Sequence, residues 1–179
     1  MDNSKEYIEQ LCQENEELVR DTAHNIWEYA ELSLEEYKSS NYLVKTLENN
    51  GFHVKRGLIG YPTSFIAIYE NGISGPTFGL LCEYDALPGL GSINGNKNGH
   101  GCGHNLFAAG AVGTAVSMRK LLKEQNLDGK IIVFGCPAEE LYGSKPFFAK
   151  QGYFDGLTCI LGFHPLEFNG VLFAQHNAI

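Results

Sequence analysis

The segment Gly99-His100-Gly101-Cys102-Gly103-His104-Asn105 brings two imidazoles and a thiol together in a glycine-rich loop. Because glycine tolerates a wide range of backbone angles, such a loop can turn tightly and direct several side chains at one point. Thiolate and imidazole are ligands that a borderline-soft divalent cation prefers. Cys102 and His104 alone provide two donors, which is too few to distinguish a metal site from a glycine-rich turn.

Further donors follow three apolar segments, residues 77–82, 130–136 and 157–163. Unbroken apolar segments of this length are typical of strands covered on both faces, as in a parallel sheet. The acidic and imidazole side chains that come after them are Glu83, Asp85, Glu139, Glu140 and His164. Open α/β sheets bind ligands at the carboxyl ends of their strands, so we expect these side chains to share one edge with the glycine-rich loop.

The donor types at this edge predict a divalent metal site. Zinc accepts thiolate, imidazole and carboxylate ligands. The chain offers them from Cys102, from His104 and His164, and from Glu139 or Glu140. A hydrolytic site also needs a carboxylate beside the metal, which takes a proton from water and passes it to the leaving group. Adjacent glutamates can divide these tasks, one binding the metal and the other staying free.

The rest of the pattern predicts a layered α-β-α fold of the α/β class with a mainly parallel central sheet. Apolar side chains recur at helical spacing over residues 5–31, and Ser33-Leu34-Glu35-Glu36 reads as a capping box at the start of a second helix. A helix over residues 105–125, with Asn105 as its N-cap, is rich in small residues. Shorter elements are expected at residues 52–55 and 64–69 (strands) and 144–151 (helix). The β-α-β-α-β order of the later elements favours right-handed crossovers.

Composition narrows the class of protein. The chain of 179 residues is 44% hydrophobic and 19% charged, which is typical of one globular domain. A net charge of −8 argues against a nucleic-acid partner and against a polybasic membrane-surface role. Residues 1–30 are polar and acidic, so we expect neither a signal peptide nor a membrane span there. Five cysteines, several within apolar segments, indicate free thiols in a reducing compartment, and we expect a cytoplasmic protein.

Four motifs in order resemble the M20 metallopeptidase family and its zinc-peptidase-like α/β fold. They are Glu83-Tyr84-Asp85-Ala86-Leu87-Pro88, Gly99-His100-Gly101-Cys102-Gly103-His104-Asn105, Pro137-Ala138-Glu139-Glu140 and Phe163-His164-Pro165. Within this family the chain is most similar to the amidohydrolase branch of the aminobenzoyl-glutamate type. The resemblance covers nearly the whole chain, including its amphipathic N-terminal helices.

The resemblance implies roles for individual residues. The implied metal ligands are Cys102, His104, Glu140 and His164. Glu139 would be the general base, and Asp85 would orient a ligand from outside the coordination sphere of the metal. The family also implies two divalent ions, zinc or manganese. The implied reaction is hydrolysis of the amide bond of an N-acyl amino acid or a dipeptide-like substrate, aminobenzoyl-glutamate being one candidate.

The chain departs from the family pattern in two positions and in length. Asn105 stands where many relatives in this branch have Asp, and Glu83 stands where peptidases outside the branch have a ligating His. The resemblance therefore assigns neither residue a role. Full members carry a lid domain, which also dimerises, and then the remainder of the catalytic domain. Residues 1–179 resemble the N-terminal portion of the catalytic domain, and the resemblance implies a homodimer formed through the lid.

Three alternatives remain open on the sequence. A cysteine hydrolase would use Cys102 as nucleophile and His104 as base, which leaves His164 and the glutamates without a role. Gly89-Leu90-Gly91 suggests a dinucleotide-binding protein, but the third glycine of that fingerprint should fall at Asn94. A truncated or inactive relative would bind metal without turnover.

Overall fold

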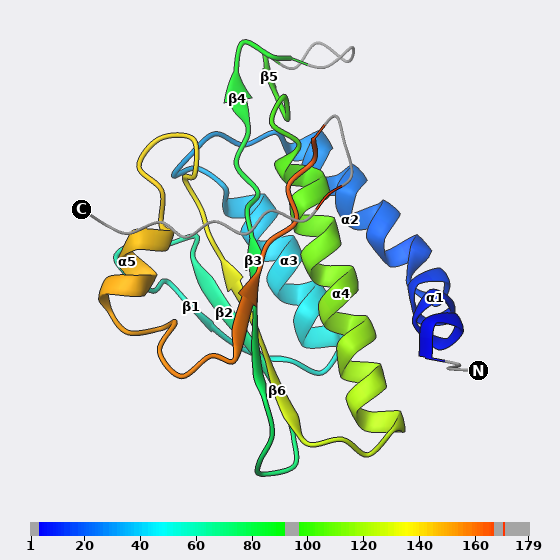
Figure 1. The fold of residues 1–179 in the computed structure, drawn as a ribbon. Helices are drawn as coiled ribbons and strands as arrows, with labels where there is room; N and C mark the ends of the chain where they lie inside the picture. Colours follow the sequence, from blue (N-terminus) through cyan, green and yellow to red (C-terminus); the bar gives the residue numbers. More distant parts are fainter. Residues whose placement is uncertain (1–3, 92–96, 167–169, 171–179) are drawn as a thin grey trace.

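A five-stranded sheet organises the computed structural model, which describes residues 4–91, 97–166 and 170. The strands are β1 (His53–Arg56), β2 (Phe65–Asn71), β3 (Thr77–Cys82), β6 (Gly129–Gly135) and β7 (Cys159–Leu161), in the order β1-β2-β6-β3-β7. Strands β6, β3 and β7 are parallel, whereas β1 pairs with β2, and β2 with β6, in antiparallel fashion. A short ribbon, β4 (Leu87–Pro88) with β5 (Asn98–Gly99), extends beyond the sheet (Figure 1).

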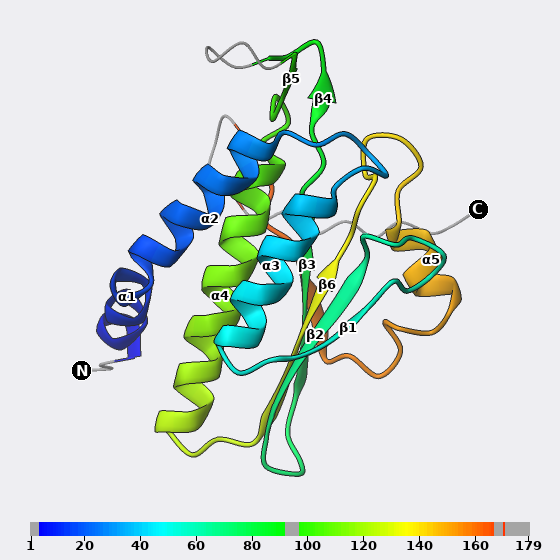
Figure 2. The ribbon, with the colours of Figure 1, turned by 180° about the vertical axis from the view of Figure 1, so that it is seen from behind.

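Helices cover both faces of this sheet. They are α1 (Ser4–Glu14), α2 (Glu16–Tyr29), α3 (Tyr37–Asn49), α4 (His104–Glu124) and α5 (Lys145–Lys150). Figure 1 views the sheet nearly edge-on, with α5 on one side and α4, α2 and α1 on the other. Figure 2 shows α3 and α2 on either side of α4. The predicted α/β fold with three layers and a mainly parallel central sheet is confirmed. None of the helices in the described part of the chain has the length and hydropathy needed to span a bilayer.

The two faces of the sheet explain the apolar strand segments. In β6, Ile131 and Val133 pack with the α2–α4 side, and Phe134 packs with Phe148 of α5. Strand β2 alternates in the same way, with Phe65 toward one cluster and Ile66 toward the other. A strand buried on both faces needs apolar residues at successive positions, so its sequence shows no polar alternation.

The edge strand β7 differs from its prediction. We expected a strand over residues 157–163 that is buried like the other two. The structure confines it to Cys159–Leu161, where Ile160 and Leu161 are exposed. It pairs with β3, and no other described strand pairs with it. The apolar composition of the segment therefore does not correspond to burial within the described residues.

The N-terminal helical segment is interrupted, so the prediction of a single helix over residues 5–31 is wrong. Asn15 separates α1 from α2. Its side-chain amide donates to the carbonyl of Leu11 at 3.1 Å and to Oγ of Ser117 at 2.8 Å. Asparagine side chains compete with the helix backbone in this way. Apolar periodicity could not show the break, because it continues on both sides of Asn15.

The predicted capping box at residues 33–36 is also wrong. Helix α3 begins at Tyr37, and neither Ser33 nor Glu36 caps it. The carboxylate of Glu31 instead accepts hydrogen bonds from backbone N–H groups in the first turn. Ser33 and Glu36 make contacts with the distant loops at the carboxyl ends of β3 and β6.

Helix α4 begins one residue earlier than predicted. Gly103, with φ 77°, is its N-cap, and His104 is its first residue. Asn105 is therefore not the N-cap, and its side-chain amide donates to the carbonyl of Ala23 in α2 at 3.2 Å. This start places His104 in the buried first turn of the helix.

Candidate metal centre

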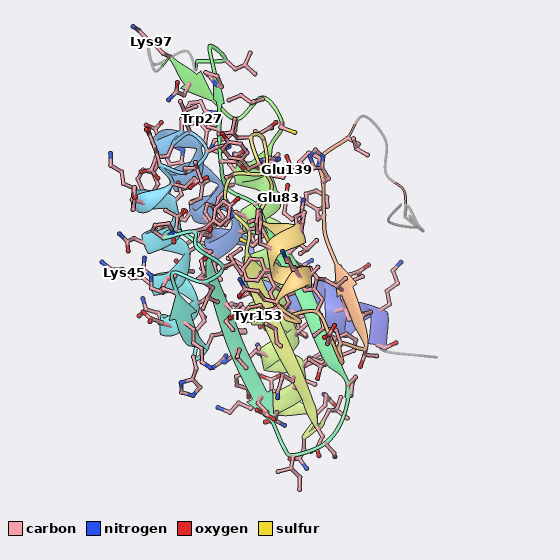
Figure 3. The ribbon with its side chains drawn as sticks, turned by 90° about the vertical axis from the view of Figure 1, so that its left-hand side faces the viewer. Trp27, Lys45, Glu83, Lys97, Glu139 and Tyr153 are labelled. Atoms are coloured by element: carbon pink, nitrogen blue, oxygen red, sulfur yellow. The ribbon has the colours of Figure 1, made fainter. Side chains whose placement is uncertain are left out.

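Loops at one end of the sheet bring the predicted donors together. Glu83 and Asp85 follow β3, Glu139 follows β6, and His164 follows β7. Cys102 precedes α4, whose N-terminus lies at the same end (Figure 1). In Figure 3 the labels of Glu83 and Glu139 stand together just above α5, at the end of the strands. The topology therefore gathers side chains that are far apart in the sequence.

The imidazole of His104 lies at the centre of these side chains and is fully buried. Its Nδ1 hydrogen-bonds Oδ1 of Asp85 at 2.9 Å, which fixes the ring. Its Nε2 has no hydrogen-bond partner. Three carboxylate oxygens surround Nε2, from Glu83 at 3.2 Å and from Glu139 and Glu140 at 3.9 Å each. Burial lowers the pKa of His104, but the Asp85 carboxylate and the neighbouring glutamates outweigh it and raise that pKa above its ordinary value.

Asp85 holds two parts of the site at once. Its Oδ1 accepts from His104, while its Oδ2 accepts from the backbone N–H of Glu140 at 3.0 Å and from Oγ of Ser33 at 2.7 Å. Burial raises the pKa of Asp85, but these hydrogen bonds outweigh burial and hold the pKa below its ordinary value. Asp85 thus stays ionised, as an acceptor that orients a metal-binding imidazole must.

Cys102 and His164 form the other side of the site. Sγ of Cys102 lies 3.3 Å from Nε2 of His164. The rings of His104 and His164 meet edge to face with centroids 5.8 Å apart, and Phe107 packs against both. At Gly103 a Cβ atom would lie 2.8 Å from Cγ of the Pro165 ring, so glycine permits the close approach of these two loops.

The thiol of Cys102 is protonated in the metal-free protein. Burial, followed by its hydrogen bond and charge interaction with Glu140, raises the pKa of Cys102 to about 11. A nucleophilic cysteine requires a lowered pKa, so this environment argues against the cysteine hydrolase. A bound divalent cation would reverse the balance, since it stabilises the thiolate directly.

The residues fit a divalent metal. Two groups of donors share His104: Cys102 and His164 complete one, and Glu83 and Glu139 complete the other. Within each group the donor atoms lie within 4.8 Å of one another. Oε1 of Glu140 is buried without a hydrogen-bond partner, as is Nε2 of His104. Buried polar atoms of this kind are normally paired, and a cation between them would satisfy both.

Sequence reasoning assigned no role to three residues that support this site. Lys145, the first residue of α5, forms an ion pair with Glu83 and lies 3.7 Å from Glu139. Ser33 contacts Asp85, as described above. Glu36 is fully buried and accepts a hydrogen bond from the backbone N–H of Ala138 at 2.8 Å.

Glu36 shapes the loop that carries the two glutamates. Its carboxylate also accepts from the N–H of Leu34 and from Oγ1 of Thr63, both at 2.9 Å. Ala138 has a positive φ of 57°, which an L-residue adopts only when its surroundings hold it there. The bond from Ala138 to Glu36 therefore fixes the backbone immediately before Glu139. No local pattern indicates this contact, because Glu36 and Ala138 are 102 residues apart.

Comparison with known proteins identifies the family. The model of peptidase family M20/M25/M40 matches residues 79–174, which contain all the candidate donors. The chain belongs to this family.

Individual relatives agree with this membership. The chain is 35% identical over 174 residues to a p-aminobenzoyl-glutamate hydrolase of Escherichia coli, covering 92% of this chain and 36% of the relative. It is 34% identical over 154 residues to the Xaa-Arg dipeptidase of Mus musculus, covering 80% and 34%. A solved dinuclear metal-binding peptidase of the M20 family from Bacillus subtilis superposes with a TM-score of 0.68 at 22% identity, covering 88% of this chain and 42% of that structure. The chain thus spans about a third of the length of the curated relatives it matches.

Proposed function

We propose that these residues form part of a metal-dependent amidohydrolase. The observation that carries the proposal is the buried Nε2 of His104, which has no hydrogen-bond partner and faces three carboxylates. Such a group of anionic and neutral donors is unfavourable without a cation and favourable with one. Membership of the M20 family supports the same function.

The proposed ligands are Cys102, His104, Glu140 and His164. The proposed ions are zinc or manganese, two per site, and the dinuclear M20 peptidase with a similar fold supports this number. When bound, such ions polarise a carbonyl group and lower the pKa of water. Asp85 keeps the His104 ring in place through Nδ1, so that Nε2 remains available to a metal.

Glu139 is the proposed general base. Its Oε2 faces Nε2 of His104 at 3.9 Å, and its Oε1 faces the ammonium group of Lys145 at 3.7 Å. The carboxylate is about one-third exposed, so both water and substrate can reach it. Glu139 would accept a proton from the attacking water at Oε2 and pass it to the departing amide nitrogen.

The proposed substrate is a small amide such as an N-acyl amino acid or a dipeptide. Relatives named as a p-aminobenzoyl-glutamate hydrolase and an Xaa-Arg dipeptidase support this class. We further propose a cytoplasmic protein that has no nucleic-acid or membrane partner and dimerises through a lid domain. Residues 1–179 would then be the N-terminal portion of its catalytic domain. A second candidate, a metal-binding chain without turnover, is favoured for these residues by themselves, because they span 36% of the first relative.

The test compares two neighbouring glutamates in a chain extended to the length of the relatives. Glu139→Gln should lower the turnover of p-aminobenzoyl-glutamate by about 10²–10⁴-fold and leave metal content unchanged, because glutamine keeps the shape and cannot accept the proton. Glu140→Gln should instead lower the metal content. A Glu139→Gln protein with wild-type turnover would show that Glu139 is not the base.

A further inference from the structure

The carboxylate of Glu83 is the buried acidic group closest to the free nitrogen of His104. Its side chain is 3% exposed, and its Oε2 lies 3.2 Å from Nε2. The corresponding oxygens of Glu139 and Glu140 lie 3.9 Å away. Two donors bound to one tetrahedral zinc ion at about 2.0–2.1 Å are separated by roughly 3.3–3.4 Å. The pair formed by Glu83 and His104 has nearly this separation.

The second oxygen of Glu83 is already occupied. Oε1 pairs with the ammonium group of Lys145, which begins α5. The helix holds this lysine in place through Phe148, which is fully buried and packs edge to face against Phe134 of β6 at 5.7 Å. One oxygen of Glu83 is therefore anchored to the protein, and the other points toward His104.

A structural role alone does not account for this arrangement. A buried ion pair needs one oxygen of Glu83 for Lys145, and the remaining oxygen would normally accept a hydrogen bond from a donor. Here that oxygen faces a ring nitrogen whose partner nitrogen hydrogen-bonds Asp85. A neutral imidazole with its proton on Nδ1 offers only a lone pair at Nε2. A cation between the two atoms removes this conflict.

We propose that Glu83 is a further metal ligand, binding through Oε2 while Lys145 holds Oε1 from outside the coordination sphere. This inference rests on the proposed function and adds a fifth ligand within this chain. The carboxylate then belongs to the donor group that it forms with His104 and Glu139. Lys145 is a positioning residue, since it acts on the metal through Glu83.

The double variant Glu83→Gln/Lys145→Met separates a ligand from a structural ion pair. It replaces both charged groups with neutral side chains of similar length, so the net charge near the site does not change. If Glu83 is a ligand, the double variant should bind metal more weakly by more than the roughly 10–100-fold that loss of an outer partner costs. Lys145→Met alone should keep or strengthen metal binding, because it removes a positive charge beside a cation and leaves Glu83 in place.

The measurement is isothermal titration of Zn²⁺ and Mn²⁺ into the 179-residue chain, with thermal unfolding of each metal-free variant. Glu70→Gln/Lys130→Met is the matched control, since Glu70 and Lys130 form an ion pair at 3.2 Å between β2 and β6. It should keep wild-type affinity. If the Glu83 double variant does not fold, Glu83→Gln alone carries the same prediction.

The outcomes distinguish this inference from the proposed function. Weak binding in the Glu83 variants, with wild-type binding in the control, supports the inference. Wild-type affinity in the folded Glu83 variants would overturn it and leave the proposed function intact. A wild-type chain that binds neither ion would overturn the proposed function, and this inference with it.

Discussion

Replacing Asp85 with asparagine should weaken metal binding while the sheet and helices remain folded. The carboxylate accepts three hydrogen bonds, from Nδ1 of His104 at 2.9 Å, from the N–H of Glu140 at 3.0 Å and from Oγ of Ser33 at 2.7 Å. Asparagine has one oxygen to accept and one NH₂ group that can only donate. Ser33 can rotate to accept from that group, but a backbone N–H and a ring N–H then compete for one oxygen.

The size of the effect follows from these contacts. One buried donor is left without an acceptor in Asp85→Asn, which costs about 1–3 kcal/mol. Loss of a charged partner behind a metal-binding histidine costs about 10–100-fold in affinity. The lower limit equals about 1.4 kcal/mol and the upper about 2.7 kcal/mol, so the two estimates agree.

Calorimetric titration of Zn²⁺ into the wild type, Asp85→Asn and Ser33→Ala measures the effect. Ser33→Ala is the control, since it removes one of the three hydrogen bonds and leaves the carboxylate on His104 and Glu140. It should change the affinity less than Asp85→Asn does. Unchanged affinity in a folded Asp85→Asn protein would refute the assignment of Asp85 as the group that orients His104.

Two further predictions concern Cys102 and Glu36. Zn²⁺ should slow alkylation of Cys102 and leave the exposed Cys12 unprotected, as peptide mass spectrometry can show; equal labelling of Cys102 with and without metal would argue against ligation. Burial raises the pKa of Glu36, so the stability that its proton contributes is complete below the unfolded pKa and is lost as pH rises through the folded pKa. Glu36→Gln should abolish this pH dependence and, at neutral pH, lower the free energy of unfolding by about 1–3 kcal/mol in urea titrations, because an amide cannot accept all three hydrogen bonds. Wild-type stability at every pH would contradict this account of the buried carboxylate.

The sequence predicted the sheet and the position of the site because both depend on regular patterns. Apolar segments at residues 77–82 and 130–136 match β3 and β6 to within one residue. Parallel strands end at a common edge, so the positions of Glu83, Glu139 and His164 after their strands indicated that these side chains meet.

The supporting contacts could not be predicted, because they join residues far apart in the chain. Glu36 was interpreted as part of a local capping box, whereas its carboxylate bonds Ala138 from 102 positions away. Lys145 follows Glu139 by six positions, and no periodicity indicates that it pairs with Glu83 instead of facing solvent. Propensity and periodicity describe neighbours in sequence, and these side chains are placed by tertiary packing.

Metal titration of the wild-type chain beside Cys102→Ala and His104→Ala tests the central claim most directly. The wild type should bind Zn²⁺ or Mn²⁺ with a defined stoichiometry, and each substitution should markedly weaken binding or reduce that stoichiometry, because each removes a donor atom from the shared site. Unchanged stoichiometry and affinity in both folded variants would contradict a metal centre at this end of the sheet.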